Sequence, residues 1–222
     1  MTENNMEDRE GVIKYRLDHR FGALPDSIDI RPINAWRTLL FRLGLIGQHP
    51  DKYHGLGYGN ISERLTLADN RGFLITGTQT GNLPILNPVH FAIVESASAK
   101  QNHIQSRGPS QPSSEALTHA SVYGLMPEAR AVIHVHCPEI WRNTLALQLP
   151  HTAAEIAYGT LDMAESVAHL FHSGQLDKQP IFSMLGHEDG IVVFADSLAT
   201  AAQILLTQLV DALAIEQTGL AG

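Results

Sequence analysis

The spacing of hydrophobic residues along the chain predicts four helices. After Pro32, the side chains of Trp36, Leu39, Leu40 and Leu43 recur at helical spacing, and glycines follow them. Three further helices are expected from periodicity and from capping residues. They cover 113–124, between a serine pair and Gly124, then 161–171, capped by Thr160, and 197–217, capped by Asp196.

Roughly seven strands are predicted from short runs of β-branched and aromatic residues. Because they are grouped rather than alternating strictly with helices, they favour a layered α/β domain whose sheet is largely antiparallel or mixed. Residues 1–30 show little periodicity and are expected to form a partly ordered N-terminal arm, ahead of a single domain over 31–222. The strands are expected at 61–67 and 72–78, on either side of the turn ADNRG, and at 91–97, 102–106, 130–137, 180–185 and 191–195.

The composition is that of a globular protein and narrows the classes of partner. The net charge is −8 and there is no run of Lys or Arg, so we expect no binding to nucleic acid. The acidic, polar start MTENNMEDREG is unlike a secretory signal, and no apolar run approaches the roughly 20 residues of a membrane helix. A single cysteine, Cys137, permits no internal disulfide. We therefore expect a cytoplasmic protein with no membrane partner.

The stretch RAVIHVHC carries the first candidate chemistry. In a strand, residues i and i+2 point to one face, so His134 and His136 lie side by side while Ile133 and Val135 face the other way. Two neutral imidazoles at this spacing suit a metal ion. A bare pair of this kind is more often two polar side chains on a half-exposed strand, so it predicts a metal only together with other residues.

A carboxylate precedes this strand by one connection. Glu115 and His119 are four residues apart on one face of the predicted helix, which leads through a short loop into the histidine strand. A carboxylate beside a pair of metal ligands is what metal-assisted proton transfer requires. The alternative is a solvated glutamate that interacts favourably with the helix dipole.

Six motifs, taken in order, make the sequence similar to the class II aldolase/adducin family, and the resemblance runs from about Ala35 to Ile215. It implies a three-layer α/β/α domain around a largely antiparallel or mixed sheet. It also implies a divalent metal held by three histidines, usually zinc, with manganese, cobalt and iron as alternatives. The resemblance further implies that the protein acts on a small-molecule substrate and forms a homo-oligomer, namely a tetramer. The motifs are GNISER (59–64), FLITGTQTG (73–81), PSSEALTH (112–119), AVIHVHC (131–137), AYGTLDMAESV (157–167) and GHEDGIVVFADSLATAA (186–202).

By the resemblance, His134 and His136 match the family's pair of metal-binding histidines. The family's third ligand lies in a later motif, in which a histidine is followed by a glycine. The matching stretch here is GHEDG, so we expect His187 to be the third ligand and the fourth position to be left for substrate. The alternatives for the third ligand are His151 and His119.

The resemblance also assigns a catalytic group and an anion site. Glu115 matches the family's catalytic acid/base in PSSE. Family members that act on sugar phosphates bind phosphate through Gly-Asn, Thr-Gly and Ser-Ser pairs, which offer backbone N–H groups and hydroxyls, although ordinary turns use the same residues. The stretch Thr76-Gly77-Thr78 competes for the threonine-glycine role. The matching residues are Gly59, Asn60, Thr80, Gly81, Ser113 and Ser114.

Two features depart from the family pattern. Glu188 and Asp189 stand directly after the third histidine, and either is expected near the metal as a ligand or as a group that orients one. Family lyases also use tyrosines as proton donors toward the aldehyde, in a longer segment after the histidine strand and in a C-terminal tail, and neither is evident here. Tyr158 or Tyr123 of a neighbouring subunit, or the two inserted carboxylates, are the candidate replacements. The five tyrosines are Tyr15, Tyr53, Tyr58, Tyr123 and Tyr158.

The sequence therefore predicts a metal-dependent, lyase-type enzyme that acts on a small hydroxy-carbonyl compound, a sugar or sugar phosphate, by retro-aldol or related enolate chemistry. Epimerisation, dehydration and decarboxylation are alternatives within the same family. A non-catalytic, adducin-like binding or scaffold protein is the alternative of another class, but a scaffold has no use for this set of histidines and glutamate. Because the family tyrosines are missing, we expect poor turnover of the family's usual deoxysugar 1-phosphates.

Overall fold

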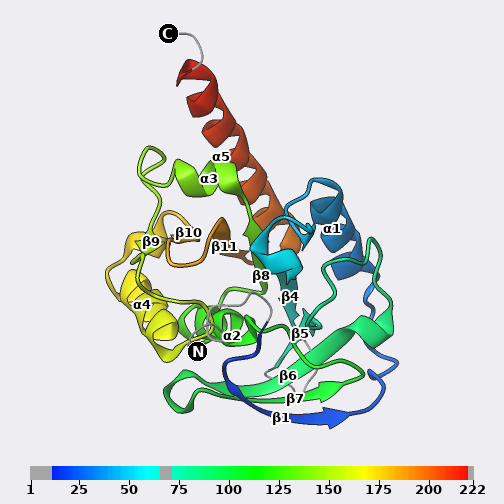
Figure 1. The fold of residues 1–222 in the computed structure, drawn as a ribbon. Coiled ribbons are helices and arrows are strands. Elements are labelled where there is room, and N and C mark those ends of the chain that lie inside the picture. Colours follow the sequence, from blue (N-terminus) through cyan, green and yellow to red (C-terminus); the bar gives the residue numbers. More distant parts are fainter. Residues whose placement is uncertain (1–11, 66–71, 220–222) are drawn as a thin grey trace, which may run out of the picture.

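The centre of the fold is a nine-stranded sheet, which the computed structural model places between two groups of helices (Figure 1). The structure describes residues 12–65 and 72–219. Across the sheet the strands follow the order β1-β7-β6-β5-β4-β8-β11-β10-β9. Their bounds are Arg16–Phe21 (β1), Asn60–Arg64 (β4), Phe73–Thr76 (β5), Phe91–Ser98 (β6), His103–Gly108 (β7), Ala131–His136 (β8), His151–Thr152 (β9), Ile181–Met184 (β10) and Gly190–Ala195 (β11).

Strand pairing is antiparallel through the middle of the sheet and parallel at its two edges. β1 pairs parallel with β7, and β9 pairs parallel with β10. β8 lies between β4 and β11 and is antiparallel to both. β2 (Gly47–Gln48) and β3 (Gly57–Tyr58) form a separate two-stranded sheet. The largely antiparallel, mixed sheet expected from the grouping of strands is confirmed.

Helices cover both faces of the sheet, so the fold is the three-layer α/β/α domain that the resemblance implies (Figure 1). α1, α3 and α5 lie on one side, where Leu40, Ile140 and Leu205 belong to one hydrophobic core. α2 and α4 lie on the other side, where Leu117 and Val167 belong to a second core. The bounds are Arg31–Arg42 (α1), Ala116–Leu125 (α2), Pro138–Arg142 (α3), Leu161–His172 (α4) and Leu198–Gly219 (α5).

Alternation along β8 sends its side chains to these two cores. Ile133 and Val135 belong to the core beneath α1 and α5, and Val132 belongs to the core beneath α2 and α4. His134 and His136 share the face of Val132 and are almost completely buried. The predicted opposition between histidines and aliphatic residues is confirmed, but the strand is buried on both faces rather than half-exposed.

The face of α1 that packs on the sheet differs from the predicted stripe. The buried residues are Ile33, Arg37 and Leu40, whereas Leu39 and Leu43 are exposed. Both sets have helical spacing, and only the three-dimensional packing selects between them. The consequence is a buried arginine beneath the loop that follows β5.

The closing helix α5 begins at Leu198, one residue later than predicted, and its cap is also shifted by one residue. Ser197, rather than Asp196, caps it, since the Ser197 hydroxyl accepts a hydrogen bond from the Thr200 N–H at 3.1 Å. By length and by a mean hydropathy of 1.6, the window Leu198–Thr218 is apolar enough to cross a membrane, although no such run was expected. One face of the helix, including Leu205, packs on the sheet, and 28% of the window is buried.

The N-terminal segment contributes more structure than its sequence predicts. Arg16–Phe21 forms the edge strand β1, within the stretch 1–30 that was expected to be an irregular or partly ordered arm. The sequence RLDHRF lacks a hydrophobic alternation because most of its side chains point to solvent at the edge of the sheet. Residues 1–11, and residues 66–71 with most of the predicted turn ADNRG, lie outside the described residues.

Candidate active site

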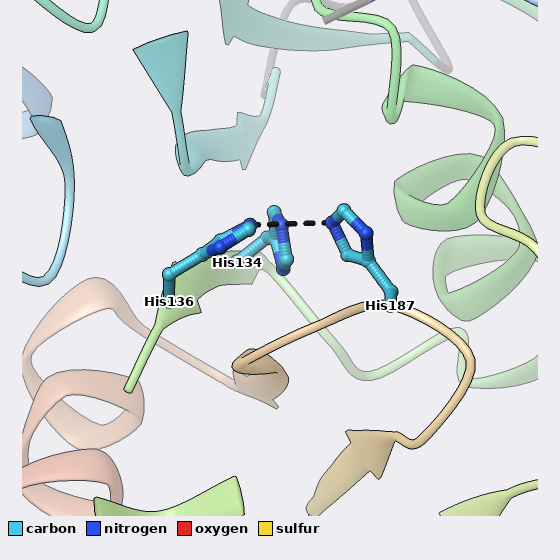
Figure 2. A group of neighbouring side chains, drawn as sticks. All are labelled: His134, His136 and His187. Atoms are coloured by element: carbon cyan, nitrogen blue, oxygen red, sulfur yellow. Dashed lines mark hydrogen bonds between the residues drawn. The ribbon is translucent and has the colours of Figure 1, made fainter. Parts of the chain in front are cut away.

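Three buried histidines from two neighbouring elements meet at one point (Figure 2). His134 and His136 extend from β8, and His187 extends from the loop between β10 and β11. His136 Nε2 lies 3.2 Å from His187 Nε2, and one ligand nitrogen of each residue lies within 4.8 Å of the others. The structure thus brings together the three residues that were expected as metal ligands.

The nitrogen atoms of this cluster fit a divalent metal ion. His134 Nδ1 lies 3.1 Å from the Ile191 carbonyl oxygen, whereas its buried Nε2 has no hydrogen-bond partner among the described residues. Burial lowers the pKa of His134 and of His136, which keeps both imidazoles in the neutral form that binds metals. Nitrogen ligands of tetrahedral zinc lie roughly 3.3 Å apart, so the cluster needs only a small contraction to hold an ion.

Glu115 lies directly beside the histidines. It is the residue before α2, and its side chain is 1% exposed. Its Oε1 lies 3.2 Å from His187 Nε2, and its Oε2 lies 3.7 Å from His134 Nε2. Burial raises the pKa of this carboxyl group, but His134 and His187 lower it by more, so the net direction is downward. The site therefore holds an anionic carboxylate next to the position of a metal.

The two alternative third ligands lie outside the cluster. His119 Nδ1 contacts Ser62 Oγ at 2.7 Å, and Ser62 Oγ in turn contacts the Tyr123 hydroxyl at 2.9 Å. Burial lowers the pKa of His119 to about 3, so its ring is neutral. His151 lies on β9 and contacts a backbone carbonyl there. Within the described part of the chain, His187 is the histidine that joins the pair on β8.

The inserted residues Glu188 and Asp189 form a turn after the third histidine. The Gly190 N–H donates to the His187 carbonyl group at 2.9 Å, and Asp189 adopts a left-handed φ of 62°. Neither carboxylate belongs to the group of metal-ligating atoms found among the described residues. Asp189 Oδ2 instead accepts a hydrogen bond of 2.5 Å from the Tyr53 hydroxyl.

The six residues of the expected phosphate site line one small cavity. It lies at the start of α2, between the loop before β4 and the loop after β5, and neither Lys nor Arg lines it. Its volume of about 10 Å³ is room for roughly one water molecule, so a phosphate group requires the loop at 78–81 to move outward. The competing Gly77 and Thr78 line the same space. The lining residues are Gly57, Gly59, Asn60, Gly77, Thr78, Gln79, Thr80, Gly81, Ser113 and Ser114.

Two glycines that line this cavity are required by the packing of the loops around it. A Cβ atom at Gly81 would clash with the Gly47 carbonyl group. Gly59 adopts a left-handed φ of 74°, and a Cβ atom there would press on Ile46. These glycines are therefore needed for the close packing of the loops, and by themselves they do not indicate an anion.

Arg37 of α1 holds one wall of the cavity and was missed in the sequence. Its guanidinium group donates to the carbonyl oxygens of Thr80 (2.9 Å), Gly81 (3.2 Å) and Leu83. Burial lowers the pKa of Arg37 to about 10, which leaves it charged near neutral pH. An arginine in an amphipathic helix is normally assigned to the solvent face, so only its spacing from Ile33 indicated burial.

A second, larger cavity, of about 140 Å³, adjoins His187. The Tyr53 ring packs edge-on against the His136 ring at 4.3 Å, and the Tyr158 ring lies 4.6 Å from the His187 ring. Tyr158 was a candidate in the sequence, whereas Tyr53 was not, although the stretch KYHGLGYGN places aromatic residues and glycines just before the GNISER motif. The lining residues are Tyr53, His54, Ala157, Tyr158, Gly186, His187 and Glu188.

Comparisons with known proteins agree with this fold. The family model described as Class II Aldolase and Adducin N-terminal domain matches residues 49–214. L-fuculose-1-phosphate aldolase from Thermus thermophilus is 22% identical, with a TM-score of 0.63 over 84% of this chain and 92% of that chain. YgbL from Klebsiella pneumoniae, named a candidate aldolase, epimerase or decarboxylase, is 20% identical, with a TM-score of 0.62 over 85% and 88%. A sugar-phosphate aldolase from Thermotoga maritima is 18% identical, with a TM-score of 0.59 over 86% and 95%. No protein of curated function matches the sequence.

Proposed function

Because the chain belongs to the class II aldolase and adducin family, we propose that it is a metal-dependent, lyase-type enzyme that acts on a small sugar or sugar phosphate. The observation that carries the proposal is the position of Glu115, 3.2 Å from His187 Nε2 and inside a buried cluster of three histidines. A carboxylate and three imidazoles are costly to bury, and such groups concentrate at sites of chemistry. An adducin-like scaffold has no need of them.

His134, His136 and His187 would hold the metal, and zinc is the ion that we propose, since three histidines with one open position form a common catalytic zinc site. When bound, such an ion supplies positive charge that stabilises negative charge developing on the carbonyl oxygen of a substrate. Glu115 accepts a proton from the substrate next to that carbonyl group and later returns it. Burial excludes water from the carboxylate and strengthens its interactions.

The proposal extends to a phosphorylated substrate, bound in the small cavity at the start of α2. Ser113 and Ser114 lie where backbone N–H groups at a helix start favour an anion. One of the similar structures is named for a sugar 1-phosphate. Because the cavity is narrow, we expect phosphate to bind with an outward shift of the loop at 78–81.

Proton exchange tests the proposed role of Glu115 without requiring a complete turnover. Zinc-loaded protein is incubated with dihydroxyacetone phosphate in deuterium oxide, and NMR follows the loss of the carbon-bound proton. We expect exchange by the wild type and at least about 100-fold slower exchange by Glu115→Gln, with unchanged zinc content. The matched control is Glu165→Gln, an exposed position on α4. Absence of exchange by wild-type protein that holds zinc would refute the proposal.

Cleavage assays separate the proposed lyase from its relatives. Fuculose and rhamnulose 1-phosphates are offered as substrates, and release of dihydroxyacetone phosphate is measured. Turnover below about one per second is expected, because the tyrosine that family lyases carry in a longer segment after the histidine strand is not evident in the short segment that follows β8. Exchange with no cleavage at all would favour the epimerase or decarboxylase alternatives, two of the activities named for YgbL.

We also propose that the protein is a cytoplasmic homo-oligomer, a tetramer by resemblance to the family. The outer face of α5 supports this, since Val210 and Leu213 are exposed there and apolar patches of this kind are typical of interfaces. Light scattering during gel filtration measures the mass, and a monomer at micromolar concentration would contradict the proposal.

A further inference from the structure

The proposed function assigns no role to the larger cavity beside His187. Its volume is about 140 Å³, close to that of a protein cavity known to take benzene, a molecule of six non-hydrogen atoms. A three-carbon hydroxyaldehyde has the same number of heavy atoms. The cavity is separate from the small space lined by Ser113 and Ser114, so the two can take different parts of one substrate.

Tyr53 forms one wall of this cavity in an unusual backbone conformation. It begins the short 3-10 helix η1 (Tyr53–Gly55), and both Tyr53 and His54 have left-handed φ angles, 49° and 58°. Such angles are unfavourable for residues other than glycine, and they persist only where surrounding contacts hold them. The ring of Tyr53 is held between the His136 ring at 4.3 Å and the Tyr58 ring at 5.0 Å.

Asp189 fixes the hydroxyl group of Tyr53. The distance from this hydroxyl to Asp189 Oδ2 is 2.5 Å, as expected for a hydrogen bond to a carboxylate. Asp189 is itself anchored, because its carbonyl group accepts a hydrogen bond from the Cys137 N–H at 2.8 Å. The residue inserted after the third histidine therefore orients a tyrosine over the cluster.

Tyr53 lines the cavity, and its hydroxyl keeps acceptor capacity beside its hydrogen bond to Asp189. A tyrosine hydroxyl has one proton and two acceptor positions, so it can accept a hydrogen bond from a substrate hydroxyl while it donates to Asp189. Tyr158, the other aromatic wall, also contacts the N-terminal segment. Its hydroxyl accepts a hydrogen bond from the Val12 N–H at 3.4 Å, and Lys14 Nζ lies 3.9 Å from the centre of its ring.

We propose that Tyr53, oriented by Asp189, binds a hydroxyl group on the aldehyde-side half of the substrate and makes the enzyme selective for hydroxylated chains of about three carbons. This inference rests on the proposed function and extends it to the second half of the substrate. Tyr53 is the residue that contacts the substrate, and Asp189 is a positioning residue that acts through it. The aldehyde half then lies against His187 and Tyr158, while the anionic half lies toward Ser113.

The test compares a hydroxylated aldehyde with one that lacks hydroxyls, in the condensation direction with dihydroxyacetone phosphate. We expect kcat/KM of the wild type to favour D-glyceraldehyde over propanal by about tenfold or more, as for one hydrogen bond to a charged pair. Tyr53→Phe and Asp189→Asn should bring this ratio close to one, mainly through KM for glyceraldehyde. Tyr58→Phe, whose lost hydroxyl contacts the Gly44 carbonyl group, is the matched control and should keep the wild-type ratio.

A binding measurement decides the same point without turnover. Saturation-transfer NMR follows binding of glycerol, an unreactive three-carbon polyol, to the zinc-loaded protein. We expect Tyr53→Phe to weaken glycerol binding about tenfold relative to Tyr58→Phe. Equal binding by the two variants, or no binding by the wild type, would overturn the inference. Proton exchange on dihydroxyacetone phosphate needs no aldehyde, so its absence would reject the proposed function while the glycerol result still judged the cavity.

Discussion

At the scale of single residues, His187 is the residue on which the proposed metal centre depends. His134 and His136 share one strand face, and two imidazoles alone hold a divalent ion weakly. We therefore expect about one zinc ion per chain in the wild type and near-complete loss of it in His187→Ala. Elemental analysis after dialysis against a weak chelator measures this. His151→Ala, which removes a histidine outside the cluster, is the control and should retain its zinc.

Full zinc occupancy in His187→Ala would contradict this assignment and would turn attention to Glu115, whose carboxylate is the next nearest ligand. Loss of zinc in both alanine variants would instead indicate a general loss of folding, which circular dichroism detects.

The sequence predicts those contacts of the site that join residues close together along the chain, and it does not predict those that join distant residues. The pairing of His134 with His136 follows from the two-residue period of a strand, and the place of Glu115 follows from a helix start one connection away. The contact between Tyr53 and Asp189 joins residues 136 positions apart. Nothing in the local pattern around either residue predicts it, because it depends on how two loops meet above the sheet.

At the scale of elements, α1 supports the loop after β5 through Arg37. Its guanidinium group, which is buried, donates hydrogen bonds to three carbonyl oxygens, those of Thr80, Gly81 and Leu83. Arg37→Lys keeps the charge but cannot reach all three acceptors. We expect this variant to lose about 1–3 kcal/mol of unfolding free energy, measured by urea denaturation, and to bind phosphate more weakly.

The control for Arg37→Lys is Arg31→Lys on the same helix. Arg31 forms an exposed ion pair with Asp29, with an N–O distance of 2.7 Å. Exposed pairs contribute about 0–1 kcal/mol, so this variant should unfold almost as the wild type does. Equal losses in the two variants would show that the buried contacts of Arg37 do not support the loop.

Helices and strands were predictable where their packing gives the sequence a recognisable hydrophobic composition or spacing. β5, β8 and β11 are rich in Val, Ile and Phe because both of their faces are covered. α4 is capped by the predicted Thr160, whose hydroxyl accepts a hydrogen bond from the Met163 N–H. The edge strand β1 and the five-residue helix α3 (Pro138–Arg142) were not predicted. The first is largely solvated and the second is too short to repeat a pattern, so neither has a readable period.

At the scale of the whole molecule, two hydrophobic cores enclose a layer of polar groups. Helices on both faces of the sheet were expected from the resemblance, and the two cores follow from alternation along strands such as β8. The same arrangement places His119, His134 and His136 in the interior, each at 2% exposure or less. The stability of the fold is therefore tied to the protonation of buried histidines.

Acid should destabilise the metal-free protein, and the sign follows from the direction of the pKa shifts. Burial lowers the pKa of His119 to about 3, and it also lowers the pKa of His134 and His136, whereas an unfolded histidine titrates near 6.5. Below that pH the unfolded chain binds protons that the folded chain does not. The contribution of these groups to stability is therefore complete above about pH 6.5 and falls as the pH drops below it. For His119 the loss is about 1.4 kcal/mol per pH unit and continues toward pH 3.

Since domains of this kind are stable by only about 5–15 kcal/mol, the metal-free protein should unfold between about pH 6 and pH 4. Urea denaturation at a series of pH values measures the slope. His119→Gln removes one of the buried histidines without touching the three-histidine cluster, so its slope should be shallower by about 1.4 kcal/mol per pH unit, whatever its stability at pH 7. His172→Gln, at an exposed position near the end of α4, should keep the wild-type slope. An unchanged slope in His119→Gln would mean that this buried ring takes up its proton in the folded state.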